Sequence, residues 1–396
     1  MIYKQIIQGL DQFDINELSM RGLTKQQINE SIICCFDKFF ENKGNLDRYA
    51  KDFLVQDWIT YKRNFYIVID DNINEVLNIF KAAKIKDTNK VFEAVSNFQE
   101  ISVEIGNKYW SMVIMQRNMS EFGDFEYIAE CFNLIDQICE IIIKNYLFLI
   151  VQMHRISKNK NSDFNDIQKL TFGDLINELN QAKKLDNLLN YFDSSISISQ
   201  WRNIACHKSY KYNDGKIECK YGKDLEHSTT IDNKKDLLDI TNKLNKIAQA
   251  INFAYKFFFY DNIQDIGSIF NQTNNDIKSR DETWHLIFVT ELYSNGFRVI
   301  EIEDKQDKLK ILLQEMTLED KEKRSIQSSI ALYKAWFHSS KKNIEIIYVD
   351  IDGYLYLSSS TTALVCEEIG KGNKDINYLA QNAVFKKLSK LKFGEE

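Results

Sequence analysis

The segment WRNIACH, residues 201–207, holds residue types whose chemistry and spacing suit a reaction at a phosphate ester. Arg202 and His207 stand five positions apart, and Asn203 follows the arginine directly. A guanidinium is a planar fork that binds two oxygens of a phosphate. An imidazole accepts or donates a proton near neutral pH. The alternative reading of this pattern is structural, with Arg202 in a surface ion pair and His207 ending a helix.

A second segment, RDETWH, repeats the spacing with Arg280, Asp281 and His285. Spacing alone therefore does not identify a site, and the surrounding residues must decide. Trp201, Ile204, Ala205 and Cys206 give the first segment an apolar face that can pack into a helical bundle, whereas the second segment leaves a polar linker. We therefore take residues 201–207 as the candidate site.

Other reactive patterns point to structure rather than to chemistry. VDIDG, residues 349–353, resembles the first motif of haloacid-dehalogenase-type phosphatases, but Tyr354 stands where that motif continues with threonine. Asp352-Gly353 between two β-rich runs is better interpreted as a hairpin turn. The seven cysteines have no CxxC spacing, which argues against a disulfide framework or a zinc site, and no glycine-rich phosphate loop is present. We expect no metal and no cofactor.

The charge balance limits the possible partners. The 396 residues carry 51 basic and 57 acidic side chains, a net charge of -6, so a general polyanion binder is disfavoured and a nucleic-acid site must be a local basic patch. The most apolar run, residues 138–153, is interrupted by Glu140, Lys144 and Asn145 and is shorter than the roughly 20 residues that span a bilayer. The sequence predicts a soluble, cytoplasmic protein with reduced thiols and no membrane partner.

The elements that would position the site are mainly helical, with a small C-terminal α+β region. Residues 1–120 have apolar residues at helical spacing and predict an N-terminal helical region. Residues 121–262 predict a bundle, with a long helix near 124–153, a closing helix near 232–260 and a hairpin at Asp214-Gly215.

The last part of the chain follows a different pattern. Residues 261–282 are polar and predict a linker. Residues 283–396 predict a domain with strands in FRVIEIE and NIEIIYVDIDGYLYLSS. Helical patterns in that domain cover about 306–318, 320–338 and 375–392.

The central third resembles the HEPN domain, a helical bundle found in many bacterial toxins and antiviral ribonucleases. The resemblance lies in TFGDLIN, then QWRNIACHKSY, then a long closing helix, over about residues 120–262. The family signature is an arginine, a polar residue that is often asparagine, a short spacer and a histidine. Arg202, Asn203 and His207 fill those three places.

This resemblance implies a metal-independent endoribonuclease whose site lies across a homodimer. RNA cleavage by its own 2′-hydroxyl needs a proton acceptor, a proton donor and positive charge near the phosphate. One histidine supplies one proton role at a time, so two copies would complete the site. Arg202 would stabilise phosphate charge, His207 would transfer the proton, and Asn203 would orient the histidine or the backbone. The family also implies a toxin or anti-phage role, with the flanking regions sensing a trigger, a regulatory protein or a ligand.

The residues after the motif suit a surface that faces RNA. Residues 200–224 hold six basic and three acidic side chains, a local charge of +3. Lys208 and Lys211 are candidates to bind phosphates, while Tyr210 and Tyr212 are candidates to stack on unpaired bases. A solvated hairpin in a chain rich in lysine and tyrosine explains the same pattern without RNA.

Two other function classes stay open. The protein could be a non-catalytic HEPN-type scaffold or a nucleic-acid- or nucleotide-binding protein, with Arg202 and His207 in structural roles. A separate enzymatic activity could also lie in the C-terminal α+β domain. Loss of RNA cleavage on replacing Arg202 or His207 distinguishes the ribonuclease from both.

Overall fold

The computed structural model describes residues 25–393 except 52, 64–66, 191–195, 271–287, 290, 293–294, 318, 339–341 and 390. The chain is mostly helical, with 65% helix and a small sheet region in its C-terminal part. It divides into two compact units. We call the described residues of 39–46 and 61–278 the bundle unit, and those of 25–38, 47–60 and 288–393 the sheet unit. No helix among the described residues is long and apolar enough to cross a bilayer.

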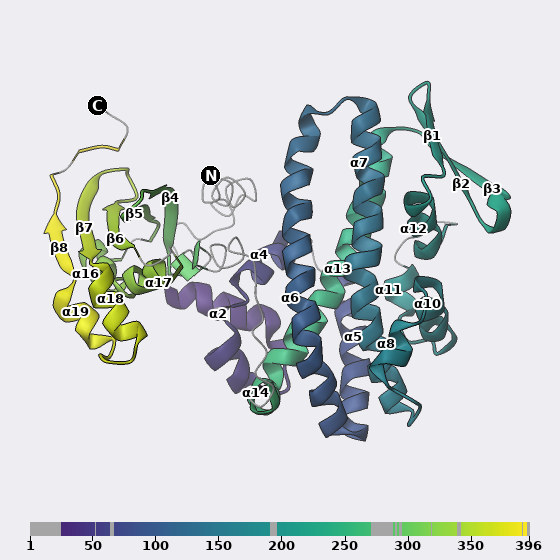
Figure 1. The fold of residues 1–396 in the computed structure, drawn as a ribbon, viewed down its shortest axis with the longest axis horizontal. Coiled ribbons are helices and arrows are strands. Elements are labelled where there is room, and N and C mark those ends of the chain that lie inside the picture. The colour runs from purple at the N-terminus through teal and green to yellow at the C-terminus, as the bar shows by residue number, and fades with distance from the viewer. Residues whose placement is uncertain are drawn as a thin grey trace. The chain divides into compact units, whose positions relative to one another are not determined.

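Five long helical segments form the core of the bundle unit (Figure 1). They are α5 (Ile67–Lys86), α6 (Thr88–Asn118), α7 (Asp124–Gln137), α8 (Lys144–Ser157) and α13 (Lys234–Asp261). Helix α13 packs against α5 and α7, and α5 packs against α8. The core between them is rich in aromatic contacts, such as Phe98 with Tyr255 and Phe80 with Phe258. The apolar spacing of each helix explains this packing, because each buries one continuous stripe.

Shorter helices precede, connect or follow these segments. They are α3 (Lys43–Asn45), α9 (Phe164–Gln168), α10 (Phe172–Gln181), α11 (Asp186–Asn190), α12 (Ile198–Cys206) and α14 (Ile263–Phe270). Helix α10 begins with a capping box, in which the Thr171 hydroxyl accepts from the Asp174 backbone and the Asp174 side chain accepts from the Thr171 backbone.

The chain does not divide near residue 120, where the sequence analysis placed a boundary. Helix α6 ends at Asn118, and α7 begins at Asp124 after a short 3-10 turn, Met119–Glu121. Helices α5 and α6 pack against α8, so both sides of the expected boundary share one core. The apolar stripes of α5 and α6 need partners, and α8 and α13 supply them. The expected N-terminal helical region is therefore split between the two units.

The long helix expected near 124–153 is confirmed, but it is not a uniform α-helix. A π-helical segment, η5 (Ile138–Ile143), joins α7 to α8. Ile138, Cys139, Ile142 and Ile143 are buried in this segment, and Glu140 is not. A π segment holds an extra residue in its turn and occurs frequently at functional sites.

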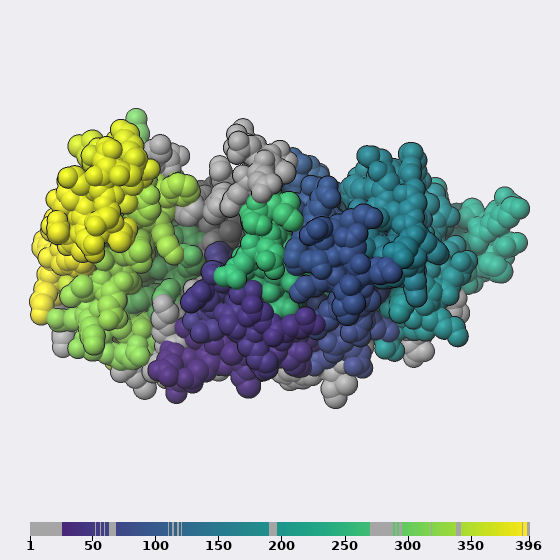
Figure 2. Space-filling view, turned by 90° about the horizontal axis from the view of Figure 1, so that it is seen from below, coloured from purple at the N-terminus to yellow at the C-terminus, as the bar shows by residue number. Residues whose placement is uncertain are grey.

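A three-stranded antiparallel sheet follows α12 in the order β1-β2-β3. Its strands are β1 (Tyr210–Asn213), β2 (Lys216–Tyr221) and β3 (His227–Ile231). Asp214 and Gly215 form the β1–β2 turn with φ of 50° and 80°, so the expected hairpin is confirmed. Figure 2 shows this segment protruding from the rest of the bundle unit.

The sheet unit is an α+β fold, as expected. Its five strands lie in the order β4-β5-β6-β7-β8, with β5 and β6 parallel and the other neighbours antiparallel. They are β4 (Phe297–Asp304), β5 (Lys308–Glu315), β6 (Asn343–Val349), β7 (Leu355–Thr361) and β8 (Val384–Lys387). The helices are α2 (Lys25–Phe36), α16 (Lys321–Gln327), α17 (Ile330–His338), α18 (Ala363–Gly370) and α19 (Asn377–Asn382), while α4 (Val55–Arg63) begins in this unit and ends in the other.

Three expectations for the C-terminal part need correction. The helix expected near 306–318 is strand β5, whose run KLKILLQE pairs with strands on both sides. The helix expected over 375–392 is α19 followed by strand β8. The expected linker begins with helix α14, which packs on α6. The turn at Asp352-Gly353 is confirmed, since the Gly353 amide donates to the Asp350 carbonyl between β6 and β7.

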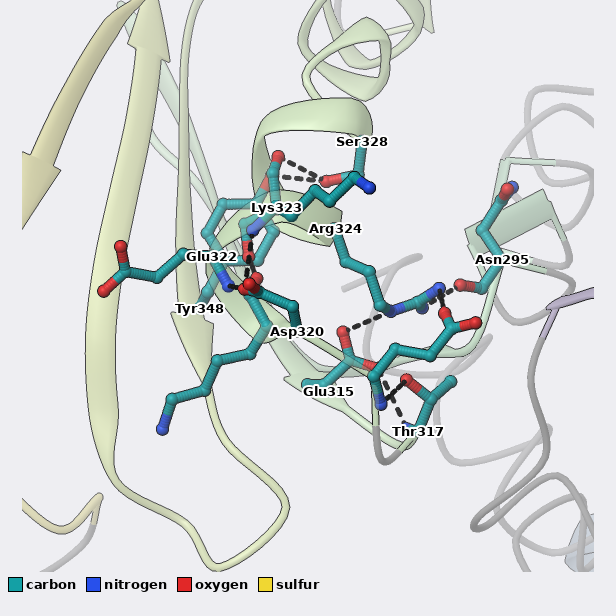
Figure 3. A network of polar contacts seen from close by, with 12 residues as sticks. Asn295, Glu315, Thr317, Asp320, Glu322, Lys323, Arg324, Ser328 and Tyr348 are labelled. Atoms are coloured by element: carbon teal, nitrogen blue, oxygen red, sulfur yellow. Dashed lines mark hydrogen bonds and ion pairs between the residues drawn. The ribbon is translucent and has the colours of Figure 1, made fainter.

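A buried arginine holds the sheet unit together near the start of α16 (Figure 3). Arg324 donates through Nε to Glu315 at 2.8 Å and through Nη1 to Glu319 at 2.8 Å, and its Nη2 donates to the Asn295 carbonyl. Both Arg324 and Glu315 are buried. Gly296 adopts a φ of 79°, and a Cβ there would lie 2.8 Å from Arg324 Nη2, so the turn needs glycine.

Replacing this arginine tests how the sheet unit is stabilised. Arg324→Ala leaves Glu315 buried without its charge partner, and we expect a loss of about 3–5 kcal/mol in the free energy of unfolding of this unit. Amide hydrogen exchange of α16 and β5 in the full chain measures the loss. The control is Lys387→Ala, whose exposed pair with Glu322 is worth about 0–1 kcal/mol. Equal amide exchange rates of α16 and β5 in Arg324→Ala and Lys387→Ala would contradict the proposed stabilising role of Arg324.

Candidate functional site

Helix α12 carries the candidate motif, and its apolar side fixes it against the bundle. Ile198, Trp201, Ile204 and Ala205 are buried. The helix packs on α7, on η5 and on strand β2. Because one side of a short helix is used for packing, the residues between these positions must face outward or toward the edge of the contact. Arg202 lies at this edge and is partly buried.

The C-terminus of α12 sets the direction of the histidine. The Ser209 amide donates to the Ile204 carbonyl at 3.1 Å, and the Lys208 amide donates to the Ala205 carbonyl at 3.3 Å. This is the Schellman arrangement, in which the residue after the cap takes a left-handed conformation. Lys208 fills that place with a φ of 52°. His207 is thus held by its backbone at the helix end, and its side chain is exposed.

Arg202 is ion-paired to a residue that the sequence analysis did not select. Its Nη2 contacts Oε1 of Glu140, and its Nη1 donates to Oδ1 of Asn203 at 3.0 Å. Both members of the ion pair are 24% exposed. The other Glu140 oxygen, Oε2, lies 2.8 Å from Nζ of Lys144. Asn203 therefore orients the arginine rather than the histidine in this structure.

A second carboxylate, Asp136, belongs to the same cluster. It lies one helical turn before Glu140 at the end of α7. Burial raises the pKa of Asp136 above its ordinary value and the charge of Glu140 adds to this, while Arg202 and His207 act in the opposite direction. The Oδ1 atom of Asp136 is buried and has no hydrogen-bond partner among the described residues.

The sequence offered one signal for the two carboxylates. Asp136 and Glu140 are four residues apart and interrupt an otherwise apolar stretch of the long helix. Charged residues inside such a stretch need partners; Arg202 and Lys144 pair with Glu140, and the charge of Arg202 acts on Asp136. The sequence did not identify Arg202 as such a partner, because the contact depends on how α12 packs on η5.

The four residues expected to bind RNA divide into two pairs. The Tyr210 ring stacks on Phe132 with a centroid distance of 3.9 Å, and Tyr212 donates to Asp124 at 3.0 Å. These contacts attach strand β1 to helix α7, so each tyrosine is partly used in packing. Lys208 and Lys211 are exposed.

The second segment with the same spacing, Arg280 to His285, lies outside the described residues. No group of three or more His, Cys, Asp or Glu side chains among the residues that the structure describes is arranged to hold a metal ion. Within the described parts of the chain, the cluster of Asp136, Glu140, Arg202 and His207 is the arrangement that unites the predicted motif with further charged groups.

The raised pKa of Asp136 predicts a pH effect on stability. Between the ordinary aspartate pKa of about 3.9 and the raised value, the folded state binds more protons than the unfolded state. The free energy of unfolding therefore falls as pH rises through this interval, and the cost persists at neutral pH. Asp136→Asn removes the charge, so we expect a higher denaturant midpoint than wild type at pH 7.

The same comparison at pH 3.5 provides the control. There the wild-type carboxyl is mostly protonated, and the two midpoints should lie closer together. An equal difference at both pH values, or a lower midpoint for Asp136→Asn at pH 7, would contradict the assignment of a costly buried charge.

Comparison with known proteins identifies no relative. No family model matches the chain, and neither a curated protein nor a solved structure does.

Proposed function

We propose that this protein is a metal-independent endoribonuclease with a HEPN-like bundle, acting as a homodimer through a site that two copies complete. The observation that carries the proposal is the pairing of a fixed arginine with an exposed histidine at the end of one helix. Arg202 is ion-paired to Glu140 and hydrogen-bonded to Asn203. The exposed side chain of His207 makes no hydrogen bond within the described structure.

The arginine keeps donors for a phosphate. A guanidinium has five N–H groups. The contacts with Glu140 and Asn203 use one hydrogen on each terminal nitrogen, and Nε is buried. One hydrogen on each terminal nitrogen is left, which is the number that a bidentate contact with two phosphate oxygens needs.

The proposed reaction is transesterification within the RNA strand. One His207 takes the proton of the 2′-hydroxyl as O2′ bonds to phosphorus. The O5′–phosphorus bond breaks, and the leaving oxygen receives a proton from the His207 of a second copy. The products are a 2′,3′-cyclic phosphate and a 5′-hydroxyl. The two imidazoles exchange protonation states, so proton return through solvent restores the starting site.

The basic residues beyond the motif supply contacts to the RNA backbone. Lys208 and Lys211 are exposed just after the helix that carries Arg202 and His207. Their position suits phosphates next to the one that is cleaved. Tyr210 and Tyr212 support the same surface by docking strand β1 on α7, where Tyr210 contacts Phe132 and Tyr212 contacts Phe125 and Asp124. Both tyrosines are partly exposed, and aromatic rings at such a surface can stack on bases.

The biological role follows only from the resemblance. We propose a cytoplasmic toxin or anti-phage effector whose activity is restrained until a trigger arrives. The sheet unit would then bind a regulatory protein or ligand. Such a role would require that the protein cleaves RNA.

A non-catalytic scaffold or binding protein is the alternative, and one observation favours it. The contact of Arg202 with Glu140 occupies part of the guanidinium, as a purely structural ion pair would. In that case the pair fixes α12 on η5 and His207 ends the helix.

Cleavage in the presence of EDTA separates the two functions. We expect the wild type to cut single-stranded RNA with EDTA present, and Arg202→Ala and His207→Ala each to lose at least about 100-fold in rate. The products are identified by their 2′,3′-cyclic phosphate ends.

Light scattering provides the control for assembly, because both variants should stay dimeric. Equal cleavage by all three proteins would reject the proposed site. Absence of cleavage by an intact wild-type dimer would favour the scaffold, and cleavage that EDTA abolishes would require a metal.

The two lysines predict a salt effect on RNA binding. Each phosphate contact on a single strand contributes about 0.7 to the slope of log affinity against log salt. Lys208→Ala and Lys211→Ala should each weaken binding of a non-cleavable RNA and lower that slope by about 0.7. Fluorescence anisotropy between 50 and 200 mM salt, roughly the useful range, measures it. Lys374→Ala, an exposed lysine of the sheet unit, should leave the slope unchanged.

A further inference from the structure

Four buried polar atoms on α7, η5 and α12 make no hydrogen bond within the described structure. They are two acceptors, Oδ1 of Asp136 and Oε1 of Glu140, and two donors, Nε of Arg202 and Nε1 of Trp201. Oε1 of Glu140 is already ion-paired to Nη2 of Arg202, so Oδ1 of Asp136 is the acceptor without any partner. Leaving a buried donor or acceptor unpaired destabilises the folded state, and more so when the group is charged. A donor and an acceptor that are both unpaired in one cluster can satisfy each other.

The elements that carry the two atoms are in contact. Asp136 is in the last turn of α7, and α12, which carries Arg202, packs on both α7 and η5. The charge of Arg202 acts on Asp136 across this contact. Glu140 follows Asp136 by four residues, so the two carboxylates lie on neighbouring turns of one helix. Arg202 therefore meets one carboxylate directly and has a second close by.

The electrostatic effects of neighbouring cations on the Asp136 carboxylate indicate which of them it contacts. Arg202 lowers its pKa more than His207 does. His207 is exposed, whereas Oδ1 of Asp136 and Nε of Arg202 are both buried. A buried acceptor is more readily reached by a buried donor of the same contact than by an exposed ring. Lys144, the other cation of the cluster, is paired to Glu140.

We propose that Asp136 is a positioning residue for Arg202, in which its unpaired oxygen receives the Nε–H of the guanidinium. Asp136 and Glu140 then bind one side of the Arg202 guanidinium, and its remaining terminal N–H groups are left to bind a phosphate. The catalytic consequence rests on the proposed ribonuclease function, while the contact itself does not.

A double-mutant cycle tests the catalytic consequence. Asp136→Ala should lower kcat about 10- to 100-fold with little change in KM, because a small misplacement of the arginine costs mainly transition-state binding. Asp136→Asn, which keeps a carbonyl acceptor, should recover most of this loss. In the Arg202→Ala background Asp136→Ala should cost nothing more, whereas in the His207→Ala background its cost should persist.

Glu130→Ala is the matched control. This carboxylate is on the same helix, is partly exposed and accepts a hydrogen bond from Asn133, so kcat should not change. A full cost of Asp136→Ala in the Arg202→Ala background would overturn the proposal, since Asp136 would then act through another group.

A second measurement does not depend on activity. In the full chain labelled with 15N-arginine, the Nε–H of Arg202 should exchange with water at least about 10-fold more slowly in wild type than in Asp136→Ala, as a change of 1.4 kcal/mol in the contact would give. Equal exchange in the two proteins would overturn the contact. Slow wild-type exchange without RNA cleavage would instead reject the ribonuclease and keep the contact.

Discussion

The ion pair between Arg202 and Glu140 is the interaction on which the candidate site depends. It joins the short helix α12 to the π segment of the long helix, and it fixes the guanidinium while His207 stays exposed. The π segment places Glu140 where it can form this ion pair. Its buried isoleucines continue the core, while Glu140 is presented at the contact with α12. Without that carboxylate, Arg202 would lose its direct charge partner and keep only the hydrogen bond to Asn203 and the nearby charge of Asp136.

The same cluster carries features that work against stability. Asp136 is a carboxyl group whose pKa is raised by burial, and an oxygen of it is unpaired. Two acidic groups lie near one arginine, where an apolar pair would pack at lower cost. Sites at which local rules of folding are broken are expected to be functional.

The sequence predicted elements more readily than contacts. The long helix near 124–153, the closing helix α13 and the Asp214-Gly215 turn follow from local spacing and turn chemistry. Strand β5 was misread as a helix because a short apolar run fits either period, and pairing with β4 and β6 decides it. Within the site, Arg202 and His207 were visible as residue types. Asp136 and Glu140 stood out only as charged residues within an apolar stretch, because the docking of α12 is what brings them to the arginine.

The most direct test of the account is a crystal structure of the dimer with a bound RNA that lacks the reactive 2′-hydroxyl. The account predicts that both His207 imidazoles lie within hydrogen-bond reach, about 3 Å, of the oxygens of one phosphodiester, beside at least one Arg202. A dimer that places the two copies of His207 on opposite faces, or a phosphate bound away from Arg202, would contradict it.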